Sequence, residues 1–237
     1  MGAFLYGVSL QWKMDIRSKT LLITCYLVPL LFFAVMGGIL TAIVPEAKET
    51  LIQSMTVFGV TMGAMIGLPP SLVEIYGSDI KKVYKANGVP LYLGFVITNL
   101  SAFVHLFLMS LILYAAAPLA FDADIPENTG YYFVSLGLLI VVSLSVASII
   151  GLAVKDQAKT SLFSILVFLP SILLSGILFP NDLLPGAFQV IGGLFPATWG
   201  YKLMENPVFQ PETGLPLLLI LGAAALICAA LLHKVRE

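Results

Sequence analysis

Seven long stretches of this chain contain no Asp, Glu, Lys or Arg, and they limit its fold more than any other feature. These stretches are residues 20–45, 50–73, 86–121, 128–154, 160–181, 183–201 and 213–233. A helix needs about 20 apolar residues to cross the hydrocarbon core of a bilayer. Backbone groups in lipid must satisfy their own hydrogen bonds, so spans of this kind are helical; a membrane β-barrel would alternate polar and apolar residues.

The overall composition excludes a soluble enzyme. Hydrophobic residues make up 59% of the chain and charged residues only 11%, whereas soluble domains carry about 25% charged residues. A soluble fold has too little polar surface to cover so much apolar surface. We therefore predict an all-α integral membrane protein that forms a single domain over residues 1–237.

Residues 183–201 differ from the other six stretches because prolines and glycines interrupt them. The interrupting residues are Pro185, Gly186, Gly192, Gly193, Pro196 and Gly200, which break or weaken helices. We predict a re-entrant or surface hairpin over 181–201, between spans five and six. The six predicted spans are about 20–45, 50–73, 88–118, 131–154, 159–180 and 213–233.

Basic residues orient these spans. With both termini in the cytosol, ten basic residues lie inside and only Lys48 and Lys202 lie outside, as the positive-inside rule requires. A seventh span over 183–201 would place nine basic residues inside and three outside, so charge disfavours that alternative only weakly. The inner residues are Lys13, Arg17, Lys19, Lys81, Lys82, Lys85, Lys155, Lys159, Lys234 and Arg236. We predict a multi-pass protein of the cell membrane.

Residues 1–19 are typical of an interfacial helix, with a frayed tail as the alternative. Their apolar stripe has helical spacing and consists of Phe4, Leu5, Val8, Trp12 and Ile16. Ser9, Lys13 and Arg17 lie off this stripe, so the helix is expected along the inner leaflet with Trp12 at headgroup depth. The basic residues follow the apolar ones, which is the reverse of a signal peptide.

The inner loop 74–87 is the most informative polar segment. Ser78 or Asp79 can cap a short helix. Ile80, Val83 and Tyr84 then form one apolar face, with Lys81, Lys82 and Lys85 around it. Such a helix fits a groove on a soluble partner or the membrane surface, whereas an ordinary basic loop is the plain alternative.

Two spans carry candidate transport residues. In the second span, Gly59, Gly63 and Gly67 allow close helix packing. A neighbouring face consists of Met55, Phe58, Met62 and Met65. This face either lines a path for lipophilic cargo as a soft apolar wall or serves ordinary helix packing. In the third span, Asn99 and His105 lie at membrane depth, where either an interhelical hydrogen bond or a substrate or proton role explains them.

Several kinds of chemistry lack the residues that they need. The chain has no phosphate-binding G-x-x-x-x-G-K-[ST] loop, so we expect no ATP hydrolysis and no cofactor in it. An ion-driven carrier usually needs a charged residue inside a span. The predicted spans contain none. Cys25 and Cys228 both lie in apolar runs and are predicted to be buried thiols, and no spacing suggests a metal site.

The order of short motifs resembles the type-2 family of ABC exporter permeases. In the fifth span and the segment after it stand a Ser-Gly, a Phe-Pro, a Leu-Pro and a further Pro, which include Gly176, Phe179, Pro180, Pro185 and Pro196. The inner loop is also similar, with Glu74, Gly77 and Ile80 before Pro90, although Val73 stands where the family often has Arg.

This resemblance implies an exporter half that pairs with a second permease chain, identical or different. It also implies two separate cytosolic ATPase subunits, which bind ATP and Mg²⁺ and dock on the inner loops, with residues 74–84 as the coupling helix. The alternatives are a channel or secondary carrier that works without an ATPase, and a membrane assembly protein that transports nothing. The sequence does not identify the cargo.

Overall fold

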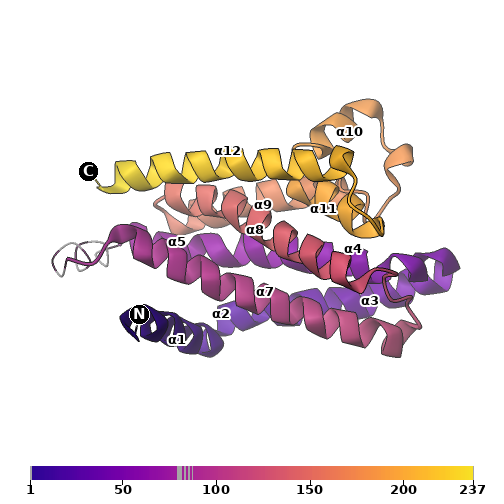
Figure 1. Cartoon of the computed structure of the whole chain (residues 1–237), viewed down its shortest axis with the longest axis horizontal. Helices are drawn as coiled ribbons and strands as arrows, with labels where there is room; N and C mark the ends of the chain where they lie inside the picture. Colours follow the sequence, from indigo (N-terminus) through magenta and orange to yellow (C-terminus); the bar gives the residue numbers. More distant parts are fainter. Residues whose placement is uncertain (1, 79–81, 83, 85, 87, 237) are drawn as a thin grey trace.

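The computed structural model describes residues 2–78, 82, 84, 86 and 88–236, and the elements formed by these residues are all helical (Figure 1). In chain order they are α1 (Gly2–Arg17), α2 (Lys19–Leu22), η1 (Ile23–Leu27), α3 (Val28–Ile43), η2 (Pro45–Glu49), α4 (Leu51–Met62), η3 (Gly63–Gly67), α5 (Leu68–Tyr76), α7 (Leu91–Phe121), α8 (Thr129–Ala153), α9 (Gln157–Leu173), η4 (Asn181–Leu183), α10 (Gly186–Gly192), α11 (Pro196–Glu205) and α12 (Pro211–Arg236).

Five helical runs are long and apolar enough to cross a membrane. They are Lys19–Ile43, Leu51–Tyr76, Leu91–Phe121, Thr129–Ala153 and Pro211–Lys234. The predicted fifth span, 159–180, corresponds to α9, which has 17 residues and ends at Leu173 rather than at residue 180. The chain then turns, and Gly176 adopts a φ of 93°, which favours glycine because it has no Cβ.

The first two spans each contain one turn of π-helix, η1 and η3. Each turn lies just before a proline, Pro29 in the first span and Pro69 in the second. A proline ring clashes with the carbonyl group four residues earlier, and a wider turn at that point relieves the clash. The two wide turns face each other, because a Cβ on Gly67 would lie 3.3 Å from the Cys25 Sγ.

The second span lies at the centre of the bundle. Its helices α4 and α5 contact α7, α8 and α9, and α4 also contacts α3 and α11. In its most apolar window 89% of the residues are buried, against 22% for the first span and 17% for α12. The first span and α12 therefore present apolar surface that needs lipid or another chain to cover it.

The bundle has two distinct ends (Figure 1). Both termini lie at one end, together with the end of α5 and the start of α7, and we call this the terminal end. At the opposite end lie η2, the 122–128 connection and α10, and we call this the hairpin end. Any site on this protein is therefore assigned to one end or to the interior between them.

Candidate functional site

At the terminal end, Gly77 joins the end of α5 to the connection between α8 and α9. A Cβ at this position would lie 2.7 Å from the Val73 carbonyl oxygen and 3.0 Å from that of Lys155. Both neighbours are backbone atoms, which cannot move aside as a flexible side chain can. Gly77, in the predicted inner loop 74–87, is therefore in direct contact with the backbone at Lys155, between α8 and α9.

Two tyrosines tie the same segment to α7. The Tyr76 hydroxyl donates a hydrogen bond of 2.6 Å to the Leu91 carbonyl. The Tyr84 ring packs against the start of α7, where a Cβ on Gly94 would lie 3.2 Å from the Tyr84 Cε2. The Val89 N–H donates to the Tyr84 carbonyl at 2.9 Å. Part of the Tyr84 ring thus contacts α7 of the same chain.

The other residues singled out in this loop are Glu74, Ile80, Lys81 and Val83. Glu74 is exposed on α5. Ile80, Lys81 and Val83 lie outside the described residues, so the apolar face predicted for them remains a prediction. Gly77 and Tyr84, which flank this stretch, both contact the rest of the helix bundle.

In the interior, the methionine and phenylalanine wall of the second span is buried against neighbouring helices. Met55, Phe58, Met62 and Met65 are all in the core. The Phe58 ring stacks on Phe32 of α3 at 3.6 Å between centroids and meets Phe168 of α9 edge-on at 5.9 Å. Phe58 thus lies where α3 and α9 both reach α4.

The glycines of the second span lie where neighbouring helices approach closely. A Cβ on Gly59 would lie 2.5 Å from the Met109 Cε, and one on Gly63 would overlap the Leu106 side chain. Both neighbours belong to α7, while Gly67 lies against Cys25 in η1. A larger residue at Gly59 or Gly63 would require the Met109 or the Leu106 side chain of α7 to move.

Asn99 and His105, the two polar residues of α7 predicted to lie at membrane depth, both contact neighbouring helices. The Asn99 amide donates to the Phe95 carbonyl at 3.0 Å and accepts from the Ser148 hydroxyl of α8 at 3.2 Å. The His105 Nδ1 lies 2.8 Å from the Tyr26 hydroxyl of η1. The Trp12 ring of α1 stacks on the His105 ring at 4.2 Å, with 11° between the planes.

Asp15 of α1, which the sequence analysis did not single out, completes the contact between α1 and α7. Its residue is only 8% exposed, and its carboxyl group accepts hydrogen bonds from the Gln11 amide, at 2.8 Å, and from the Ser101 hydroxyl of α7. Ile16, which belongs to the predicted apolar stripe, is instead 45% exposed. The sequence feature that could have indicated this contact is the presence of an acidic residue, Asp15, within an amphipathic helix.

The hairpin end contains the segment whose prolines resemble the family motifs. Pro196 is buried at the first position of α11, and Pro185 precedes α10. Phe179 and Pro180 are exposed in the turn that follows Gly176. The Thr198 hydroxyl and the Trp199 indole N–H donate to the carbonyls of Gly192 and Gly193, at 2.6 and 2.7 Å. These bonds fold α10 back onto α11.

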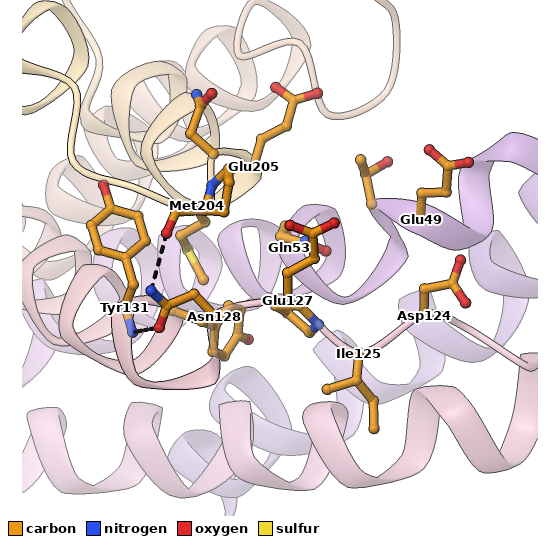
Figure 2. A pocket seen from close by; sticks show the side chains of 14 residues that line it. Glu49, Gln53, Asp124, Ile125, Glu127, Asn128, Tyr131, Met204 and Glu205 are labelled. Carbon is orange, nitrogen blue, oxygen red and sulfur yellow. Dashed lines mark hydrogen bonds between the residues drawn. The ribbon is translucent and has the colours of Figure 1, made fainter.

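A cavity of about 800 Å³ opens at the hairpin end between η2, the 122–128 connection and the end of α11 (Figure 2). Four acidic residues line it, and they are Glu49, Asp124, Glu127 and Glu205. Glu205 is an exposed residue, but partial burial of its carboxyl group raises its pKa, and nearby Lys202 offsets part of this effect. This cavity could not be predicted from the sequence, because its four acidic residues come from three separate segments.

Comparison with known proteins gives one finding on the family. A family model described as ABC-2 type transporter matches residues 3–209, which is most of the chain. No curated protein gives a match.

Proposed function

This chain belongs to the ABC-2 type transporter family and is a multi-pass transmembrane permease of an ABC transporter, and we propose that it forms half of an ATP-driven exporter. In this proposal a second permease chain, identical or different, supplies the other half. ATP and Mg²⁺ are bound and used by a separate cytosolic ATPase subunit, because this chain has no phosphate-binding loop.

The observation that supports coupling is the packing at the terminal end. Gly77 lies against the α8–α9 connection, while Tyr76 and Tyr84 bind the start of α7. A force applied to residues 78–87 would therefore reach α5, α7 and α9 together. We propose residues 74–87 as the segment that the ATPase grips, with Ile80 and Val83 facing the partner and Tyr84 holding the segment to the bundle.

The proposed topology places the terminal end in the cytosol of the cell and both termini with it. The predicted distribution of ten inner and two outer basic residues supports this orientation. The shorter helix α9 would complete a sixth span together with the turn after Leu173. In this arrangement α10 and α11 form the hairpin on the outer side, and α1 lies along the inner leaflet.

The proposed path for the cargo runs along the faces of α3 and α9 that the chain itself leaves uncovered. Leu27, Leu31 and Val35 repeat every four residues on an exposed stripe that begins at the end of η1 and continues along α3. On α9, Leu162, Leu166 and Leu169 are exposed in the same way. Phe58 lies behind the junction of these helices, so a second chain packed there would enclose a path that Phe58 closes.

Co-purification with an ABC ATPase tests this proposal. Apolar residues buried in a groove contribute much of the binding energy of an interface, whereas charges at the rim contribute little. Tyr84 has a different role in this proposal, because its ring holds the segment against α7 near Gly94. The double substitution Ile80→Ala and Tyr84→Ala should therefore abolish capture of the ATPase and ATP-dependent transport, while Lys81→Ala, the matched control, should retain both.

Three results would contradict the proposal. The first is capture of the ATPase by the double variant at wild-type strength with transport intact. The second is transport by the purified chain without any ATPase, which would indicate a channel or carrier. The third is ATP hydrolysis that follows the pure chain through purification, because the proposal assigns all hydrolysis to the partner.

A further inference from the structure

We propose that the two π-helical turns, η1 and η3, form a paired hinge at which the first two spans change their tilt during the transport cycle. This inference rests on the proposed ATP-driven function, because it names the point in the bundle at which a movement of residues 74–87 becomes a movement of the spans. Its evidence is the pairing of the two turns, the prolines beside them, the small contact between them and the way in which the helices on either side are held.

The two turns are not a general consequence of proline in this chain. Pro118, Pro170 and Pro216 also lie inside helices, yet α7, α9 and α12 are continuous α-helices. Among the residues that the structure describes, π-helical turns occur only at Ile23–Leu27 and Gly63–Gly67, and these two turns contact each other. Turns of this kind are rare and are often found at functional sites, so their pairing indicates a function for this position.

Prolines weaken the backbone at both turns. Pro29, Pro69 and Pro70 have no N–H group, so they cannot donate to the carbonyls four residues earlier, which lie within η1 and η3. Helices bend sharply at prolines and at π-helical turns, where the regular hydrogen-bond ladder is interrupted. Each of the two spans is therefore predisposed to bend at the level where the turns meet.

The contact between the turns involves small residues. A Cβ on Gly67 would lie 3.3 Å from the Cys25 Sγ and 3.5 Å from the Thr24 Oγ1, and a Cβ on Gly63 would lie 3.5 Å from the same thiol. A cavity of about 10 Å³ beside these glycines leaves further space. Because neither glycine has a side chain that interlocks with the other span, the turns can change their relative tilt without a steric block.

On the hairpin side of the hinge, the two spans are joined to each other and to α8. The Phe32 ring of α3 stacks on the Phe58 ring of α4 at 3.6 Å between centroids. The Thr56 hydroxyl of α4 lies 2.8 Å from the Tyr132 hydroxyl, near the start of α8. These contacts hold α3, α4 and the hairpin end of α8 together as one part.

On the terminal side, α5 is joined to the segment on which the ATPase is proposed to act. The Tyr76 hydroxyl donates to the Leu91 carbonyl at the start of α7. Near the end of α8, a Cβ on Gly151 would lie only 2.8 Å from the Leu72 Cβ of α5, so these two helices are expected to move together. A force on residues 74–87 would therefore tilt α5 and the terminal end of α8, and η3 lies where α5 meets α4.

A disulfide across the hinge tests the proposal. In a background with Cys228→Ala, the substitution Gly67→Cys brings a thiol within reach of the native Cys25 thiol. Oxidation of the purified chain with copper phenanthroline should cross-link the pair, and mass spectrometry detects the loss of both free thiols. When the ATPase is added to the cross-linked chain, Mg-ATP hydrolysis should be at least about tenfold slower than with the reduced chain, and dithiothreitol should restore it.

Two controls separate the hinge from other effects. Gly67→Cys combined with Cys25→Ala has no partner thiol, so oxidation should leave its rate of hydrolysis unchanged. As a test without a cross-link, the double substitution Pro69→Ala and Pro70→Ala restores two N–H donors to the second span. It should slow hydrolysis about tenfold while the melting temperature stays equal or rises, whereas Pro216→Ala in α12 should leave hydrolysis unchanged.

The outcomes distinguish the hinge from the function on which it rests. Failure of the purified chain to cross-link would show that the turns do not face each other and would overturn the hinge. Equal hydrolysis in the cross-linked and the reduced complex would also overturn it, and would leave the coupling proposal standing. If the reduced chain captures no ATPase, the proposed function fails and the hinge fails with it, even though the chain alone still forms the disulfide.

Discussion

The contact between α1 and α7 gives the sharpest stability prediction, and its perturbation is Ser101→Ala. The Ser101 hydroxyl of α7 donates to the carboxyl group of Asp15, which is buried and has Gln11 as its other partner. A hydrogen bond to a charged group contributes about 1.5–3 kcal/mol. The substitution should therefore favour detachment of α1 by that amount, while the Trp12–His105 stack remains.

Hydrogen–deuterium exchange of α1 measures this detachment. Because about 1.4 kcal/mol is a factor of ten, amide exchange in residues 8–17 should become roughly ten- to a hundredfold faster. The matched control is Ser110→Ala on the same helix. Ser110 is also buried, but its hydroxyl donates to the Leu106 carbonyl within α7, so its loss should change exchange in α1 very little. Unchanged exchange in Ser101→Ala, or equal acceleration in Ser110→Ala, would refute the reasoning.

Two further predictions concern packing and topology. Gly63→Ala should lower the free energy of unfolding by about 1–3 kcal/mol, because its Cβ would overlap the Leu106 side chain. Gly137→Ala on α8 has open space and should be neutral or stabilising in a thermal melt. Equal melting temperatures for the two variants would contradict the packing described for the second span. In a background with Cys25→Ala and Cys228→Ala, an impermeant thiol reagent added to intact cells should label Glu46→Cys and leave Lys81→Cys unlabelled. Labelling of Lys81→Cys from outside would reverse the topology.

Much of the fold follows from local sequence properties. The charge-free stretches predicted the long helices, and the order of the Ser-Gly, Phe-Pro and Leu-Pro motifs predicted the family, which the match over residues 3–209 confirms. The helix α9 ends at Leu173, before the end of the predicted span 159–180. Hydropathy continues through the turn, so only the backbone conformation at Gly176 shows where the helix has ended.

Contacts between segments that are distant in the chain could not be predicted from one sequence. Asp15 and Ser101 are 86 residues apart, and nothing in either segment indicates the other. The acidic cavity likewise combines residues from η2, the 122–128 connection and α11, which are brought together only by the packing of the helices. Hydrophobic periodicity reports which face of a helix is buried, but not which helix covers it.

The central claim is that an ATPase drives this permease through residues 74–87, and accessibility at Phe58 tests it most directly without knowledge of the cargo. Phe58→Cys, in the background with Cys25→Ala and Cys228→Ala, is labelled with a maleimide in the complex with the ATPase. We expect Mg-ATP to raise the rate of labelling above that in ADP, and the double substitution Ile80→Ala and Tyr84→Ala to abolish this rise. The control Leu139→Cys, buried against Gly200, should stay unlabelled throughout. Equal labelling of Phe58→Cys in ATP and ADP, or a rise that survives the double substitution, would contradict the account.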